Sequence, residues 1–151
     1  MPRADGRWVT RNHTYLVQED GTVLMDGALL FRISPEGRIT DQDGALVVTV
    51  QRDGHIVGPN GEKVGRVLTL GVSRPGQDWL WFSIEWDGII EFRRKPDTLK
   101  TIGFWNGCRE GLTTCVVVTH LILMGASISV HIGADSRVPA ECGLNAPAGV
   151  V

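Results

Sequence analysis

Three stretches repeat one pattern: GTVLMDGALLFRI at 21–33, GRITDQDGALVVTV at 37–50 and GHIVGPNGEKVGRV at 54–67. Each contains a glycine, a short strand-like run, a second glycine in a turn, and another strand-like run. The second glycines, Gly27, Gly44 and Gly61, are 17 residues apart. A repeat this short predicts one β-hairpin per unit. The first glycines extend the series to six units, at intervals of 15 to 17 residues: Gly6, Gly21, Gly37, Gly54, Gly71 and Gly88.

Turn-forming dipeptides accompany these glycines. Asp-Gly occurs six times and Asn-Gly twice, and both tolerate the positive φ angles of tight hairpin turns. The runs between the turns alternate with the period of a strand. In WLWFSIEW at 79–86, Leu80, Phe82, Ile84 and Trp86 share one face, while Trp79, Trp81 and Ser83 share the other. Six hairpins of this kind predict twelve antiparallel strands.

An apolar segment follows the repeats. The run TCVVVTHLILMGASISVHIGA at 114–134 contains no Asp, Glu, Lys or Arg. It can form a buried helix, two further strands broken at Gly125, or a membrane span. Geometry favours the helix, because a barrel of twelve strands is too wide to be filled by its own side chains. A helix about 10–12 Å across has the size that such a barrel requires.

The fold is therefore predicted to be mainly β. About six β-hairpin repeats form a twelve-stranded antiparallel barrel, with a C-terminal hydrophobic helix through its centre. The barrel and the helix, at about 113–133, form a single domain over 1–135. Residues 136–151 are expected to form an irregular C-terminal tail.

Composition narrows the function classes. The chain has 151 residues and a net charge of −2, without the basic stripe typical of a nucleic-acid-binding domain. The N-terminus has no apolar run, so no secretory signal is expected. The three cysteines, Cys108, Cys115 and Cys142, are an odd number and argue against a disulfide scaffold. We expect buried or half-buried free thiols at Cys108 and Cys115; a metal pair, a lipidation site and a redox pair are the alternatives.

The repeats and the terminal apolar segment together resemble a known family. Over Gly6–Ala134 the layout is similar to that of the tubby-like superfamily, which includes tubby proteins, phospholipid scramblases and LURP-one-related proteins. It also resembles the bacterial β-flower proteins, which are shallower relatives. The resemblance implies a barrel around a hydrophobic helix and binding to phosphoinositides. The basic pocket of tubby domains is not placed on residues of this chain, and the palmitoylation segment of scramblases is absent from it.

One surface is predicted to bind lipid or a partner, because tryptophans and basic residues gather in the last two repeats. Other candidates are weaker. His120 and His131 fall on one helical face but supply only two metal ligands, and Asp41–Gly44 reads as a hairpin turn rather than a calcium loop. No catalytic residue, metal or cofactor is predicted. The residues of the predicted surface are Trp79, Trp81, Arg93, Arg94, Lys95 and Lys100.

These observations predict a non-enzymatic binding domain that associates with lipid headgroups or a membrane surface. The alternative is a structural or protein–protein interaction module without a lipid role, which the acidic turns and the negative net charge favour. The expected partners are an anionic phospholipid or a protein, and not nucleic acid. The expected location is the cytoplasm, at the periphery of a membrane.

Overall fold

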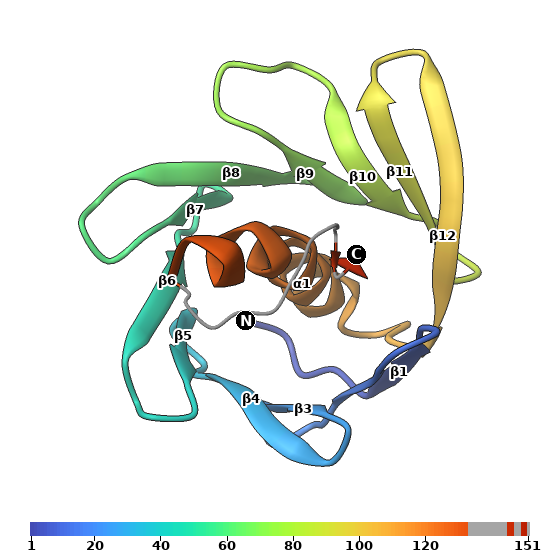
Figure 1. Ribbon diagram of the computed structural model, residues 1–151. Coiled ribbons are helices and arrows are strands. Elements are labelled where there is room, and N and C mark those ends of the chain that lie inside the picture. Colours follow the sequence, from blue (N-terminus) through green and yellow to red (C-terminus); the bar gives the residue numbers. More distant parts are fainter. Residues whose placement is uncertain (133–144, 147–148, 151) are drawn as a thin grey trace. The chain divides into compact units, whose positions relative to one another are not determined.

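Twelve strands form a closed antiparallel barrel in the computed structural model, which describes residues 1–132, 145–146 and 149–150. Each strand pairs with the next one in the chain, and β1 (Gly6–Val9) pairs with β12 (Thr98–Gly107) to close the ring (Figure 1). The predicted barrel of six hairpins is thereby confirmed. The strands between are β2 (Thr14–Val17), β3 (Thr22–Met25), β4 (Ala28–Ile33), β5 (Arg38–Asp41), β6 (Leu46–Val50), β7 (His55–Val57), β8 (Lys63–Leu68), β9 (Gly71–Ser73), β10 (Leu80–Ile84) and β11 (Ile89–Lys95).

The first glycine of each repeat lies at one end of the barrel, where the chain reaches the base of a hairpin. A Cβ atom built on Gly54 would lie 2.7 Å from the carbonyl oxygen of Val67, and one on Gly88 would lie 2.1 Å from that of Trp105. No side chain fits at such a distance, so these positions require glycine. All six first glycines would place a Cβ within 2.7 Å of another residue, and we call them the glycine ring: Gly6, Gly21, Gly37, Gly54, Gly71 and Gly88.

The second glycines lie in the turns within hairpins, at the other end of the barrel. A Cβ atom on Gly27, Gly44, Gly61 or Gly76 would meet nothing within 4 Å. Their φ angles lie between +78° and +86°, so conformation alone explains glycine at these positions. We call these four the hairpin-tip glycines.

Alternation along the strands directs one set of apolar side chains into the barrel. Phe82 and Ile84, which were predicted to share a face, are both completely buried. Burial of this kind is the main favourable term in folding. Other completely buried residues come from strands all around the barrel: Val23, Ile39, Ile56, Val72 and Ile90.

The apolar segment forms one helix, α1 (Leu112–Ile132), and not two strands. Its ends lie within one residue of the predicted range. Every residue from Thr114 to Leu121 is buried, which agrees with a segment that is apolar on all sides. The position of the helix in the centre of the barrel stays a prediction.

The chain divides into two compact units, Met1–Val116 and Val117–Val151. The first contains the barrel and the beginning of α1. Two contacts hold that beginning in place: the Thr114 hydroxyl donates a hydrogen bond to the Pro2 carbonyl, and Cys115 is bonded to Cys108. The second unit contains the rest of the helix and two short strands, β13 (Asn145–Ala146) and β14 (Gly149–Val150).

Candidate functional site

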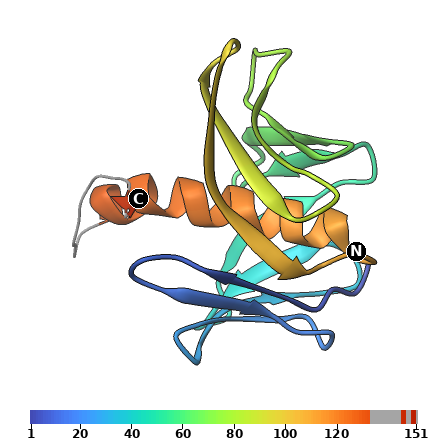
Figure 2. The same cartoon turned by 90° about the vertical axis from the view of Figure 1, so that its right-hand side faces the viewer.

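The four basic residues of the predicted surface all lie on the β11–β12 hairpin. Its strands, of seven and ten residues, are the longest in the barrel, and Figure 2 shows them in olive to yellow as a two-stranded finger. Arg94, Lys95 and Lys100 are exposed, and Arg93 is half-buried. Leu99 stands opposite Arg93 and keeps 49% of its surface exposed. The hairpin therefore presents an apolar side chain among cations.

The two tryptophans of the predicted surface are less accessible. Trp81 on β10 is only 3% exposed, and the Arg74 guanidinium lies 4.1 Å from the centre of its ring. Burial lowers the pKa of Arg74. Trp81 also meets Phe92 edge-on at 5.8 Å, and Phe92 stands opposite Lys100, so the structure does bring Trp81 to the basic hairpin. Trp79 is half-buried in the segment that precedes β10.

Trp86 is the most exposed of the large apolar residues whose side chains the structure describes, and it was not among the residues of the predicted surface. The alternation over 79–86 predicted that Trp86 would share a face with Ile84, and this was wrong, because Ile84 is completely buried whereas Trp86 is 77% exposed. The strand ends at Ile84, and the Gly88 amide donates to the Glu85 carbonyl (2.8 Å) to form a turn that contains Trp86. The signal was present in the Asp87-Gly88 dipeptide that follows.

Two further exposed apolar side chains lie where β1 and β12 close the barrel. Trp8 pairs with Trp105 across β1 and β12, and their neighbours Val9 and Phe104 point to the outside. Val9 is 57% and Phe104 59% exposed. The strict alternation of Phe104 with the buried Trp105 was the only sequence signal for this pair.

Aromatic packing closes the same seam on the inside. The rings of Trp8 and Tyr15 lie 5.4 Å apart, and those of Trp8 and Trp105 lie 5.8 Å apart. Burial, with a smaller contribution from the Asp26 carboxylate, raises the pKa of Tyr15 to about 12. Tyr15 therefore stays neutral at physiological pH and contributes to the core rather than to proton transfer.

Two hollows open at the glycine-ring end of the barrel. The first, which we call the Trp86 hollow, has a volume of about 500 Å³. The second has about 720 Å³ and lies between the turns that contain Pro35 and Arg52. The Trp86 hollow is lined by Ile84, Glu85, Trp86, Asp87, Gly88, Trp105, Gly107, Cys108, Arg109 and Leu112.

Cys108 and Cys115 form a disulfide, so the expectation of two free thiols was wrong. Cys108 has a φ angle of +68°, which turns the chain back after β12, and its Cα lies 6.2 Å from that of Cys115 at the start of α1. This separation is typical of disulfides. A spacing of seven residues does not reveal such a turn. Cys142 lies outside the described residues.

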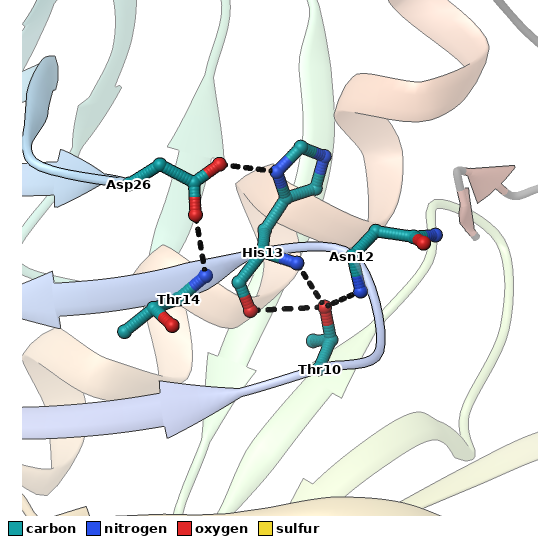
Figure 3. A network of polar contacts seen from close by, with 5 residues as sticks. All are labelled: Thr10, Asn12, His13, Thr14 and Asp26. Atoms are coloured by element: carbon teal, nitrogen blue, oxygen red, sulfur yellow. Dashed lines mark hydrogen bonds and ion pairs between the residues drawn. The ribbon is translucent and has the colours of Figure 1, made fainter.

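A polar network joins the first two hairpin tips (Figure 3). His13 Nδ1 lies 2.7 Å from one oxygen of the Asp26 carboxylate, and the Thr14 amide donates to the other oxygen at 2.9 Å. The Thr10 hydroxyl donates to the His13 carbonyl and accepts from the amides of Asn12 and His13. The hydrogen bond with His13 is the main cause that lowers the pKa of Asp26. The network ties β1–β2 to β3–β4.

The remaining candidates do not assemble a metal site within the described residues. One Asp41 oxygen accepts hydrogen bonds from the amides of Asp43 and Ala45, as in an ordinary hairpin turn. His120 is completely buried. The side chain of His131 lies outside the described part of the chain.

Comparisons with protein-family models, curated proteins and solved structures found no match. Within the part of the chain that the structure describes, no helix has the length and apolar character needed to cross a bilayer.

Proposed function

We propose that this chain is a non-enzymatic binding domain, with a barrel of the tubby-like or β-flower type, that associates with anionic membrane surfaces. The β11–β12 hairpin is the element that binds. The observation that carries the proposal is the exposed Leu99, which stands opposite Arg93 and close to Arg94, Lys95 and Lys100 on one projecting hairpin. Apolar insertion combined with cations is the chemistry that recognises an anionic lipid surface.

Charge is distributed to favour one orientation. Residues 93–100 carry four cations and the single anion Asp97, a net charge of +3, whereas the whole chain carries −2. The rest of the protein therefore carries −5, and an anionic surface repels it while it attracts the hairpin. Each cation near such a surface contributes about 1 kcal/mol to the free energy of membrane binding. The hairpin charges and the partial burial of Leu99 thus supply weak, reversible binding of about 4 kcal/mol.

Co-sedimentation with vesicles tests the proposal. We expect the protein to bind phosphatidylcholine vesicles that contain phosphatidylserine and not vesicles of phosphatidylcholine alone. Arg94→Glu with Lys95→Glu should weaken binding about thirtyfold or more, because two attractive charges become repulsive. Arg38→Glu with Lys63→Glu makes the same charge change on exposed positions outside the hairpin and should have a smaller effect. Equal binding to both kinds of vesicle, or equal losses in the two variants, would refute the proposal.

A protein-interaction module is the second candidate, and the exposed pair Val9 and Phe104 favours it. These side chains stand on adjacent strands at the seam of the barrel, outside the basic hairpin. If this face mediates self-association, light scattering should show an oligomer for the native protein and a monomer for Phe104→Ser. A native monomer would count against this function in its self-associating form.

A further inference from the structure

Trp86 occupies a turn position that the fold does not require to be aromatic. Four turns at the glycine-ring end share the same hydrogen bond, from the glycine amide to the carbonyl three residues before it. The second residue of such a turn can be almost any residue. The other three turns carry Glu19, Pro35 and Arg52 at this position, whereas the fourth carries Trp86 and exposes 77% of its surface.

The exposed indole lies at the edge of the Trp86 hollow, whose volume of about 500 Å³ suits a small ligand or a single side chain. The larger hollow at the same end of the barrel has Pro35 and Arg52 in its walls and contains no aromatic residue. The barrel geometry therefore produces hollows between turns, and only the first of these two combines the hollow with an aromatic face.

Two carboxylates that line the Trp86 hollow, those of Glu85 and Asp87, are each held by one hydrogen bond. Ser83 Oγ donates to one oxygen of Glu85 (3.2 Å), and the Ile89 amide donates to one oxygen of Asp87 (3.2 Å). Among the described residues, no donor reaches the second oxygen of either carboxylate. Each of them therefore keeps an acceptor available beside Trp86.

The third charged group of the hollow is Arg109, which forms no ion pair with Glu85 or Asp87 within the described part of the chain. Two carboxylates and one guanidinium leave the lining with a net charge of −1. An aromatic face beside carboxylates is the environment that binds organic cations, because the ring attracts the cation and the carboxylates neutralise it.

We propose that the Trp86 hollow binds the cationic group of a ligand, an alkylammonium or a guanidinium. Trp86 supplies the aromatic face, and Glu85 and Asp87 supply the counter-charge. Arg109 limits the site to one cationic group and can pair with an acidic group on the same ligand. A free amine and a basic side chain of a protein share this chemistry. The inference does not depend on the basic hairpin, which lies on other residues.

The test is an NMR titration of the tryptophan indole N–H signals, with the signal of Trp86 assigned from the variant Trp86→Phe. The probes are choline chloride, N-acetyl-arginine amide and 3,3-dimethyl-1-butanol, the uncharged carbon analogue of choline. We expect at least one of the two cations to shift the Trp86 signal saturably and the uncharged analogue to leave it unchanged. A saturable shift with choline alone indicates that the ligand is a free quaternary amine, and a saturable shift with the arginine amide alone indicates that it is a protein side chain.

Charge variants give the decisive control. Glu85→Gln with Asp87→Asn removes both negative charges, keeps the size of the side chains and leaves one acceptor oxygen in each, and it should weaken binding about tenfold, whereas Arg109→Gln should tighten it a few-fold. Glu19→Gln with Asp20→Asn makes the same change on the equivalent turn and should leave affinity unchanged. No saturation with either cation up to about 100 mM, an equal shift with the uncharged analogue, or equal losses in the two carboxylate variants would overturn the proposal.

Discussion

Gly88 at the glycine ring and Gly44 at a hairpin tip have nearly the same backbone, with φ angles of 91° and 83°. Their surroundings are opposite. A Cβ atom on Gly88 would lie 2.1 Å from the Trp105 carbonyl oxygen, whereas one on Gly44 would meet nothing within 4 Å. Positive φ is therefore found at both ends of the barrel, whereas close approach of another residue distinguishes the glycine ring from the hairpin-tip glycines.

This difference explains why the tips can carry function at little cost. Each tip turn needs only residues that tolerate the φ angles of the turn. The tips therefore vary in sequence: the first ends in His13, and the last contains Pro96 and Asp97. The ring turns must in addition admit a neighbouring carbonyl or sulfur at the base of each hairpin. The basic residues of the β11–β12 hairpin, which we propose bind lipid, are thus compatible with the fold, because they lie at its tolerant end.

The largest expected effect separates the two glycine classes directly. Gly44→Ala introduces only the left-handed backbone cost of about 1–2 kcal/mol. Gly88→Ala adds a steric overlap worth about another 1–3 kcal/mol, because the Trp105 carbonyl belongs to a strand and cannot move freely. Urea unfolding should give a clearly larger loss of unfolding free energy for Gly88→Ala. Equal losses would show that the ring glycines are kept for conformation only.

The disulfide is expected to have the next largest effect. It closes a loop of eight residues, 108–115, at the glycine-ring end, and the chain-entropy relation gives about 2–3 kcal/mol for a loop of this size. Cys108→Ser with Cys115→Ser should lower the unfolding free energy by that amount in urea titrations. A reductant should destabilise the native protein to the level of the variant and leave the variant unaffected. An effect of the reductant on both proteins alike would contradict the assignment.

Gly6 links the disulfide to the glycine ring and predicts a smaller, coupled effect. A Cβ atom on Gly6 would lie 2.2 Å from Cys108 Sγ, and Gly6 does not have a positive φ angle. Gly6→Ala should therefore destabilise the native protein by about 1–3 kcal/mol through overlap. In the background Cys108→Ala with Cys115→Ala the sulfur is gone, so the loss should be about 1 kcal/mol smaller. Strictly additive losses would show that the sulfur is not what the glycine accommodates.

The sequence predicted the barrel because its signals are local. The intervals between glycines and the Asp-Gly turns predict the number of hairpins, and alternation predicts which side chains, such as Phe82 and Ile84, share a face. The Cys108–Cys115 disulfide was missed because it depends on the positive φ angle of Cys108, a residue type that rarely adopts one.

The candidate site was less predictable for a related reason. Trp86 continues the alternation of β10, yet the strand stops two residues earlier, at Ile84. The hydrogen bond from the Gly88 amide to the Glu85 carbonyl places Trp86 in a turn, which the Asp87-Gly88 dipeptide signals but the alternation does not. The place of Trp81 on the face opposite to that of Phe82 likewise did not reveal that Arg74 and Phe92 cover it. Exposure depends on neighbours from other strands, and periodicity within one strand does not contain that information.

The smallest expected effect concerns the hairpin tips, where Asp26 joins two of them through His13 and Thr14. Because the pKa of Asp26 is lowered in the folded protein, its ionised form stabilises the fold at neutral pH. This contribution is present above the unfolded pKa of about 4 and is lost as pH falls through the lower folded value. Asp26→Asn keeps an acceptor for the Thr14 amide and tolerates the φ angle of 53°.

Asp26→Asn should therefore lower stability at pH 7 by no more than about 1 kcal/mol, since the pair is exposed. The difference from the native protein should shrink as pH falls below the ordinary Asp pKa of about 4, and it should disappear once the native carboxyl is protonated as well. Thermal unfolding over this pH range measures this, and Asp43→Asn at another hairpin tip controls for the loss of a carboxylate. A pH-independent difference would mean that the two tips are held together by shape rather than by the charge of Asp26, which would make the tip end as rigidly specified as the glycine ring.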